Sequence, residues 1–208
     1  MTRAARCVAW AAALLLAGCA ALRPAPPIRT FRLTYPVPGP ERTTPLPVTV
    51  RVLPFGIASA YDRQGFIYRS GPYDVGVDYY NRWIGSPASL ITDLVARDLA
   101  ASKTLQAVLQ APSALPSDYE INGEIETLEE DDEAASCAAH LRLRVALVAA
   151  PSTGARHVVM QDGFAADEPC TRGDPTSYAE AMSRAVQRAS DAIRAALLRA
   201  IEQNARDA

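Results

Sequence analysis

The sequence predicts an α+β fold, in which a mostly antiparallel sheet carries two main helices packed on it. Segments in which apolar and polar residues alternate predict strands, and an amphipathic segment with helical spacing follows them. This order of strands and then a helix occurs twice, without a residue-level repeat behind it. Strands and helices grouped in this way are typical of α+β domains.

The first half of the chain contains four strand-like segments and one helix. A Pro-rich stretch, YPVPGPERTTPLP, separates the first two strands, and Gly71-Pro72 joins the last two as a hairpin. The helix has Ser86 as its N-cap and Pro87 at its first position, and its apolar residues recur at helical spacing. The predicted strands are TFRLTY (30–35), VTVRVLPF (48–55), GFIYRS (65–70) and YDVGVDYY (73–80), and the predicted helix spans residues 86–102.

The second half repeats the order with longer strands and a longer helix. Asp174 and Pro175 are typical of a helix start, and the apolar residues that follow keep helical spacing. The acidic run EEDDE (129–133) lacks the spaced oxygen ligands and the glycine of a calcium loop, so we interpret it as a solvated loop between two strands. The predicted strands are KTLQAVLQ (103–110), DYEINGEIETLE (118–129), AAHLRLRVALVAA (138–150) and ARHVVMQDGFA (155–165), and the helix spans residues 174–203.

The last two strands flank the turn-forming cluster PSTG and predict a hairpin that brings two cysteines together. If Ala150 faces Ala155, the numbers of paired residues sum to about 305, and Cys137 faces residue 168, two positions from Cys170. If the chain is exported into an oxidising space, as its N-terminal residues described below indicate, pairing of the two cysteines is favoured. We therefore expect a disulfide that closes the hairpin, with two free buried thiols as the alternative.

The N-terminal residues have the layout of a secretory signal peptide, which we assign to residues 1–18. Arg3 and Arg6 precede an apolar run that ends in small residues and is too short to span a membrane stably. The run closes with LAGC, which resembles the bacterial lipobox, in which the cysteine is acylated and becomes the first mature residue. Lipidation of Cys19 is therefore expected, and the alternative is a buried N-terminal helix that happens to contain a cysteine.

Residues 19–30 then form a lipidated, Pro-rich tether, and residues 31–204 form the folded domain. The segment ALRPAPPIRT should be extended, at about 3.1 Å per residue. Ala20 follows the lipid site, and the absence of an inner-membrane retention Asp there favours the periplasmic face of the outer membrane. Loss of Arg3 and Arg6 moves the formal charge from −2 to −4, so no nucleic-acid partner is expected.

Residues suited to catalysis are sparse in this chain. The two histidines, His140 and His157, lie on predicted strands. Their residue numbers sum to 297, whereas paired residues of the hairpin sum to about 305, so the two should not meet across it. The mature sequence has no G-x-S-x-G motif and no glycine loop of the kind that holds phosphate. Because the disulfide would use the two remaining cysteines, neither a zinc site nor another metal site is expected. The sequence thus predicts a protein that is not an enzyme and needs no cofactor.

Large aromatic side chains are concentrated between residues 62 and 83, in DRQGFIYRSGPYDVGVDYYNRW. One interpretation is a half-buried hairpin, since aromatic and β-branched residues suit a pleated surface, and it applies best to Phe66 and Val77. The other is a binding surface, because Tyr, Trp and Arg are enriched at interface hot spots. We predict that the following residues contact a partner: Tyr68, Arg69, Tyr73, Tyr79, Tyr80, Arg82 and Trp83.

Residues 61–102 resemble the core motif of the ABC-type transport auxiliary lipoproteins, a group that includes paraquat-inducible protein C. In that family a strand ending in hYR-x-G-P leads to a second strand, then to RW and a helix. The matching residues are Ile67-Tyr68-Arg69-Ser70-Gly71-Pro72, Arg82-Trp83 and the helix start at Ser86-Pro87. The lipobox, the early strand and the closing helix fall in the family's order. The YYN before Arg82 and the pair Cys137 and Cys170 depart from its pattern.

The resemblance implies an accessory subunit of a lipid-handling ABC or MCE-type transport system. Such a subunit is anchored by its lipid to the outer membrane and docks on the periplasmic, MCE-domain component without catalysis. Two alternatives stay open: a lipoprotein that itself binds lipid or another apolar ligand, and an envelope-assembly lipoprotein. The alanine-rich helix at 175–203 would also allow copies of the chain to pack into a homo-oligomer.

Overall fold

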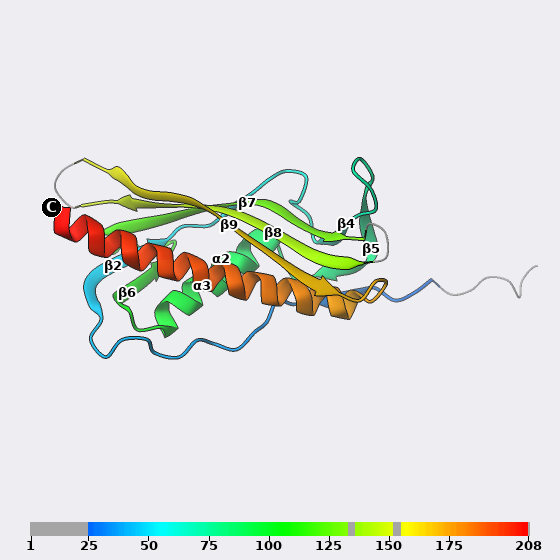
Figure 1. Ribbon diagram of the computed structural model, residues 1–208, viewed down its shortest axis with the longest axis horizontal. Helices are drawn as coiled ribbons and strands as arrows, with labels where there is room; N and C mark the ends of the chain where they lie inside the picture. Colours follow the sequence, from blue (N-terminus) through cyan, green and yellow to red (C-terminus); the bar gives the residue numbers. More distant parts are fainter. Residues whose placement is uncertain (1–24, 133–135, 152–154, 208) are drawn as a thin grey trace, which may run out of the picture.

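The computed structural model describes residues 25–132, 136–151 and 155–207, and over these ranges the chain forms one large sheet with two helices beneath it (Figure 1). The predicted signal peptide and Cys19 lie outside the described residues. The strands are β1 (Arg29–Phe31), β2 (Leu46–Val52), β3 (Gly56–Ile57), β4 (Gly65–Arg69), β5 (Val75–Trp83), β6 (Leu105–Gln110), β7 (Tyr119–Asp131), β8 (Cys137–Ala149) and β9 (His157–Cys170). The helices are α2 (Pro87–Ala101) and α3 (Pro175–Asp207).

Strand β7 is the centre of the sheet. Along one edge it pairs antiparallel with β8, which in turn pairs antiparallel with β9. Along the other edge it pairs in succession with β2, β3 and β4, all parallel to it. The contacts of β2 with β6 and of β5 with β1 are parallel too, and β4 with β5 is antiparallel.

The prediction of a mostly antiparallel sheet was therefore wrong, although the α+β class is confirmed. The reason is that β2, β3 and β4 are pieces of one path that follows the same edge of β7. The chain reaches β7 only after crossing through β5, α2 and β6, and such a crossover brings strands back in parallel. Pro54 interrupts this path between β2 and β3, because proline cannot donate a ladder hydrogen bond.

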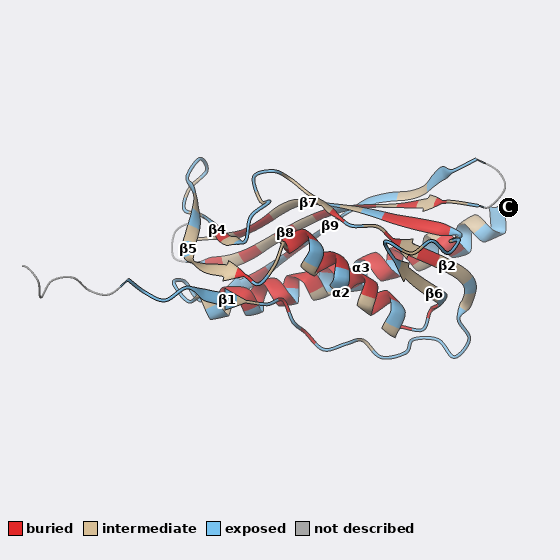
Figure 2. Ribbon diagram, turned by 180° about the vertical axis from the view of Figure 1, so that it is seen from behind, coloured by how far each residue is buried: buried red, intermediate tan, exposed pale blue. Residues whose placement is uncertain are grey.

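Both helices cover the same face of the sheet, as the sequence predicts. Helix α3 runs under β8 and β9, and its buried stripe is rich in alanine, which lets the helix approach the strands closely. Helix α2 lies beside it, with Ile91, Val95 and Leu99 buried. Figure 2 shows that the buried residues gather between the helices and the sheet. Gly123 of β7 allows one close contact in this layer, since a Cβ there would lie 2.6 Å from the ring of Phe55.

The β8–β9 ladder differs in register from the prediction. Cys137 faces Cys170, so the paired numbers sum to 307 at this end instead of the expected 305. Near the turn, Val148 faces Val158, so the paired numbers there sum to 306. A bulge at Leu147/Val148 shifts the register by one residue, which gives 307 along the rest of the ladder. The ladder therefore brings the two cysteines directly opposite each other.

The segment between β1 and β2, residues 32–45, crosses both helices on the face away from the sheet, and we call it the strap (Figure 1). Thr34 N donates to Ser183 Oγ (3.1 Å), and Glu41 N donates to the carbonyl oxygen of Ser102 (2.8 Å). The predicted strand at 30–35 is thus mostly strap. Strand β1 begins at Arg29, inside the predicted tether, and pairs with β5.

One buried carboxylate joins the strap to both helices. Asp98 of α2 is 1% exposed, and its Oδ2 accepts hydrogen bonds from Tyr35 Oη and Ser190 Oγ, both at 2.7 Å. Its Oδ1 accepts from Arg97 Nε at 2.9 Å. Burial, followed by the hydrogen bond to Asp98, raises the pKa of Tyr35, so this hydroxyl stays protonated and keeps donating.

Replacing Asp98 should therefore loosen the whole helical layer. We expect Asp98→Ala to lower the free energy of unfolding by about 3 kcal/mol, because two buried hydroxyls lose their acceptor. Urea unfolding measures this change. Asp93→Ala on the exposed side of the same helix, where the carboxylate accepts from Gln110 at 3.2 Å, is the control. Equal losses in the two variants would show that Asp98 does not hold the layer together.

Candidate functional site

The β4–β5 hairpin carries a cluster of exposed apolar side chains at one end of the molecule (Figure 1). Of the ten large hydrophobic side chains that are exposed in the described chain, six lie between residues 68 and 84, so the exposure is concentrated there. Four of them form what we call the hairpin surface: Tyr73 in the turn, and Val75, Val77 and Tyr79 along one face of β5. The fifth, Tyr68, is paired with Gly76 and lies on the other face of the hairpin, so it does not belong to this surface. The sixth, Ile84, directly follows β5.

Local sequence explains why the hairpin stands out from the sheet. Ser70 N donates to the carbonyl oxygen of Asp74 (3.0 Å), and Ser70 Oγ donates to the Asp74 carboxylate (2.9 Å), which closes the turn around Gly71-Pro72. Tyr73, in this turn, is 98% exposed. Neither described helix covers this end of β5, so alternate residues of the strand face solvent.

Two features order the aromatic rings of the hairpin. The ring of Tyr68 lies across Gly76, where a Cβ would come within 2.2 Å of Tyr68 Cζ, so the glycine leaves the room that the ring needs. Tyr79 and Tyr80 meet edge to face with their centroids 5.3 Å apart. Tyr80 itself is only partly exposed and contributes less to the surface than Tyr79.

Trp83 is not part of the surface, and its prediction as a partner-binding residue was wrong. Its side chain is 1% exposed and packs on Phe66 (centroids 4.4 Å apart) and on Tyr178 of α3 (5.9 Å). The reason is an irregularity in β5, where Asp78 Oδ1 accepts from the backbone N–H groups of Tyr80 (2.7 Å) and Asn81 (3.0 Å). This irregularity shifts the register with β4 and turns the end of β5 toward the helices.

Arg69 is bound within the protein, on the open face of the sheet. Its guanidinium contacts Glu129 (3.3 Å) and Asp131 (2.5 Å), and Tyr61 Oη also donates to Glu129 (2.8 Å). The role of Arg69 that the structure shows is therefore to join β4 to β7. Arg82 is half-buried, and its only hydrogen bond found among the described residues is a long one to the carbonyl oxygen of Tyr79 (3.5 Å).

The acidic run belongs to strand β7 up to Asp131, so its interpretation as a loop was wrong. Alternate carboxylates of the run, Glu129 and Asp131, contact basic side chains on the neighbouring strands. These contacts offset the repulsion between the acidic side chains of the strand. His140 of β8 lies between Asp131 (3.2 Å) and Asp167 (2.6 Å). The hydrogen bond from Arg142 to Asp167, ahead of the other causes, lowers the pKa of Asp167. His157 lies at the far end of the β8–β9 ladder from Cys137, so the two histidines do not meet.

A second chemical feature lies on the opposite face of β7, where Glu130 points toward the Cys137–Cys170 disulfide. The Cα atoms of the two cysteines are 5.0 Å apart, and Glu130 Oε1 lies 3.3 Å from Cys137 Sγ. Burial raises the pKa of Glu130 to about 7, and the nearby carboxylates of Asp132 and Asp78 add to the effect. The sequence did not indicate this residue, because nothing in an acidic run says which member faces inward.

Glu130 and the two cysteines are also the one convergent group of potential metal ligands found among the described residues, with their ligand atoms within 4.8 Å of one another. The two sulfurs are bonded to each other, however, and zinc is bound by thiolates. The group in this state therefore does not offer a zinc site.

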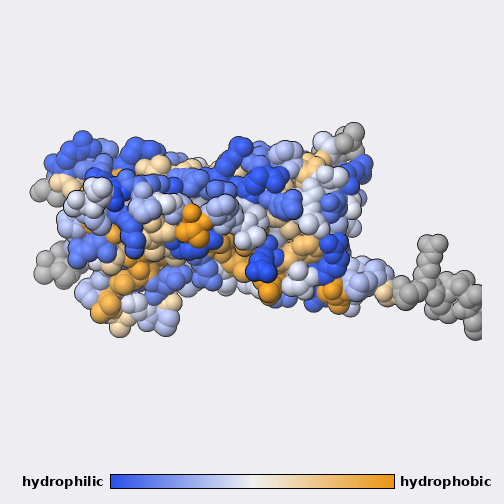
Figure 3. Space-filling view, turned by 90° about the horizontal axis from the view of Figure 1, so that it is seen from below, coloured by the Kyte–Doolittle hydropathy of each residue, from blue (hydrophilic) through white to orange (hydrophobic). Residues whose placement is uncertain are grey.

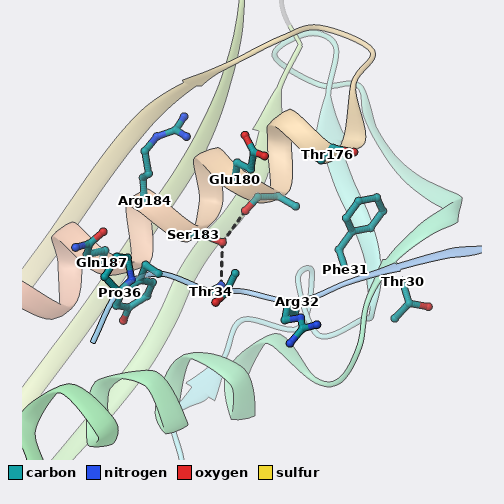
Figure 4. A pocket seen from close by; sticks show the side chains of 12 residues that line it. Thr30, Phe31, Arg32, Thr34, Pro36, Thr176, Glu180, Ser183, Arg184 and Gln187 are labelled. Carbon is teal, nitrogen blue, oxygen red and sulfur yellow. Dashed lines mark hydrogen bonds between the residues drawn. The ribbon is translucent and has the colours of Figure 1, made fainter. Parts of the chain in front are cut away.

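The grooves of the helical side are open and differ in character. The groove between β2 and the end of α3 is mostly apolar, with Leu46, Val48 and Ile201 in its lining. Another, of about 470 Å³, lies between the strap and α3, where the bond from Thr34 to Ser183 closes its floor (Figure 4). Its lining includes Arg32, Glu180 and Arg184 beside Phe31. Seen from this side, hydrophobic residues form small patches separated by hydrophilic ones (Figure 3). This groove thus lacks the enclosed apolar wall that a lipid carrier needs.

Comparison with known proteins identifies the family. The model of the ABC-type transport auxiliary lipoprotein component matches residues 31–194, most of the chain. The chain belongs to this family. The resemblance drawn from the hYR-x-G-P and RW motifs is thereby confirmed, and the family name implies a lipoprotein of the cell envelope that assists an ABC transporter. No curated protein matches the sequence.

Solved structures show the same fold at low sequence identity. Protein XCC0632 from Xanthomonas campestris, a DUF330 protein, is 20% identical with a TM-score of 0.75, and the match covers 86% of this chain and 99% of that one. The hypothetical protein CT253 from Chlamydia trachomatis is 12% identical with a TM-score of 0.52, covering 74% and 96%. An auxiliary transport component fits a protein that is not an enzyme. Neither α2 nor α3 of the described chain is both long and apolar enough to cross a membrane.

The half-buried Glu130 makes stability depend on pH. Because its pKa is raised from 4.5 to about 7 by folding, its contribution is fully present below pH 4.5 and is lost as the pH rises through 7. Allowing for solvent screening, we expect the free energy of unfolding to fall by about 1–2 kcal/mol between pH 5 and pH 8 on its account.

Denaturant unfolding of the wild type and of Glu130→Gln across this range measures the effect. The amide does not titrate, so the difference between the two proteins should vary with pH. A constant difference from pH 5 to pH 8 would contradict the raised pKa. Glu126→Gln, a half-buried carboxylate of the same strand that pairs with Arg144, is the control and should keep the wild-type dependence.

Proposed function

We propose that this lipoprotein is an outer-membrane-anchored accessory subunit of an ABC/MCE-type lipid transport system and docks on its periplasmic component through the hairpin surface. The observation that carries the proposal is the concentration of exposed tyrosine and valine side chains on one hairpin. A surface of this kind is costly to leave in water, and tyrosine combines large contact area with few rotatable bonds. Its occupant is a protein partner, the MCE-domain component.

The anchor is acylated Cys19, in the LAGC motif that precedes the described residues. Acylation on this cysteine would hold the chain on the periplasmic face of the outer membrane, and Ala20 supports sorting there. Two acyl signals or more are needed for stable anchoring, which fits a multiply acylated cysteine.

The fold relates the anchor to the docking surface. The described chain enters the domain at the same end of the molecule that bears the hairpin, and the C-terminus lies at the other end (Figures 1 and 2). Strand β1 pairs directly with β5, with Arg29 opposite Asn81. Arg29 lies ten positions after Cys19, a reach of at most about 35 Å. The hairpin surface is therefore kept near the anchoring membrane, where a component that spans the periplasm would present its end.

The described residues favour docking over catalysis and over carriage of a lipid. His140, which could serve as a base, is flanked by two carboxylates and faces no nucleophile in the described part of the chain. The groove between the strap and α3 is open and partly charged. Docking without chemistry uses the stretch of the described chain in which exposed large hydrophobic side chains are most concentrated.

Site-specific photo-crosslinking in the intact envelope tests the proposal. We expect a probe in place of Tyr73 or Tyr79 to capture an MCE-domain or permease-linked periplasmic protein, because these side chains are 98% and 70% exposed. A probe at Arg188, whose side chain is exposed on α3, is the control and should not capture it.

Other captures would overturn the proposal in distinguishable ways. Lipid alone would indicate a carrier, and a cell-wall or lipopolysaccharide-export protein would indicate an envelope-assembly role. A second copy of this chain as the sole product would place the surface in a homo-oligomer. Capture at Arg188 but at neither tyrosine would move the docking surface to α3, and no capture at any position would show that the hairpin binds nothing.

A further inference from the structure

The Cys137–Cys170 disulfide has an acid next to only one of its sulfurs. Glu130 Oε1 lies 3.3 Å from Cys137 Sγ, and because a disulfide sulfur carries no hydrogen, only a protonated Glu130 carboxyl could donate in this contact. If the disulfide were reduced, the same distance would let the Cys137 thiol donate to the carboxylate. The geometry thus suits the passage of a proton between Glu130 and Cys137.

The two sulfurs differ in access. Cys137 is 5% exposed, whereas Cys170, at the end of β9, is partly exposed. An external thiolate would therefore reach Cys170 first. Cys137 is then the sulfur that leaves, and it leaves on the side of the molecule where Glu130 lies.

The surroundings of Glu130 favour the protonated form of its carboxyl group. The charges that raise its pKa are carboxylates, Asp78 on β5 and Asp132 after β7, and Arg172 is paired with Asp132. From α3, the buried Tyr178 hydroxyl has no hydrogen-bond partner among the described residues. Burial and these carboxylates bring the pKa of Glu130 to about 7, where it can both give and take a proton.

We propose that Glu130 passes a proton to and from Cys137 while an external dithiol opens and re-forms the Cys137–Cys170 disulfide. The partner class is a thiol–disulfide oxidoreductase of the envelope, which supplies the dithiol when the bond opens and the disulfide when it closes. Because the disulfide joins the ends of β8 and β9, opening it would remove the covalent link at the last pair of the ladder, just before the chain leads into α3.

The exchange balances without any further reagent. A thiolate of the dithiol attacks Cys170 Sγ and forms a mixed disulfide, while the bond to Cys137 breaks and Cys137 leaves with the electron pair and takes the proton of Glu130. The second thiol of the reagent then loses its proton to water and attacks the reagent sulfur that is bonded to Cys170. The bond between that sulfur and Cys170 breaks, and Cys170 leaves as a thiolate and is protonated by water. The dithiol is oxidised by two electrons, the two cysteines are reduced, and Glu130 regains its proton from solvent.

Reduction kinetics of the full-length lipidated protein in detergent test the proposal, with dithiothreitol as the dithiol. The rate, divided by the concentration of the dithiothreitol thiolate at each pH, isolates the role of the protein's own acid. We expect Glu130→Gln to lower this rate about tenfold at pH 6, and to remove its decline between pH 6 and pH 8. Glu126→Gln, a carboxylate on the same strand that faces Arg144, should behave as the wild type.

Three further variants sharpen the test: one guards against a loss of folding, and two compare the two sulfurs. Glu130→Asp keeps the acid but withdraws it from the sulfur, and we expect a rate between those of the wild type and Glu130→Gln. In Cys137→Ser, Cys170 should form a mixed disulfide faster than Cys137 does in Cys170→Ser. A Glu130→Gln or Glu130→Asp protein with the wild-type rate and pH profile, or preferential attack at Cys137, would overturn the proposal.

Discussion

The arrangement of this protein depends on the burial of one charge. Asp98 is enclosed between α2, α3 and the strap, where its carboxylate would be very costly without donors. Tyr35 and Ser190 supply these donors from the other two segments, and Arg97 supplies a third and stacks over the Tyr35 ring at 4.5 Å. Because each donor must come within hydrogen-bond distance of one carboxylate, these bonds restrict how the three segments lie relative to one another. The strap in turn holds the entering chain, with β1 beside β5, against the rest of the fold.

The long strand β7 separates two kinds of surface. On its helical face the side chains are apolar, apart from Glu130 at the end beside the disulfide. On its open face, carboxylates pair with cations from β4 and β8, so that a sheet without helices above it stays soluble on that side. The helices do not reach over the hairpin, and there the ion pairs give way to tyrosine and valine. Six of the ten exposed large hydrophobic side chains of the described residues are thus concentrated between residues 68 and 84, at the end where the chain enters (Figure 1).

Features set by neighbouring residues could be predicted from the sequence, and those set by distant partners could not. The helix start at Pro87 followed from local spacing, and so did the β8–β9 hairpin. The parallel strands along β7 could not be foreseen, because a period of two does not say which strand lies alongside. Trp83 was misplaced because the irregularity at Asp78 turns β5 inward, and no simple alternation predicts it. Arg69 finds its acidic partners some sixty residues later in the chain, at Glu129 and Asp131.

The central claim is that the tyrosines of the hairpin serve binding and not folding. It is tested most directly by comparing Tyr73→Ser/Tyr79→Ser with Trp83→Ala in the full-length lipidated protein, measuring both the free energy of unfolding and the transporter component that co-purifies. The account predicts that the double variant changes stability by less than about 1 kcal/mol while losing the co-purifying component, whereas Trp83→Ala loses about 3–5 kcal/mol. A double variant that is destabilised as much as Trp83→Ala, or that still retains the component, would contradict it.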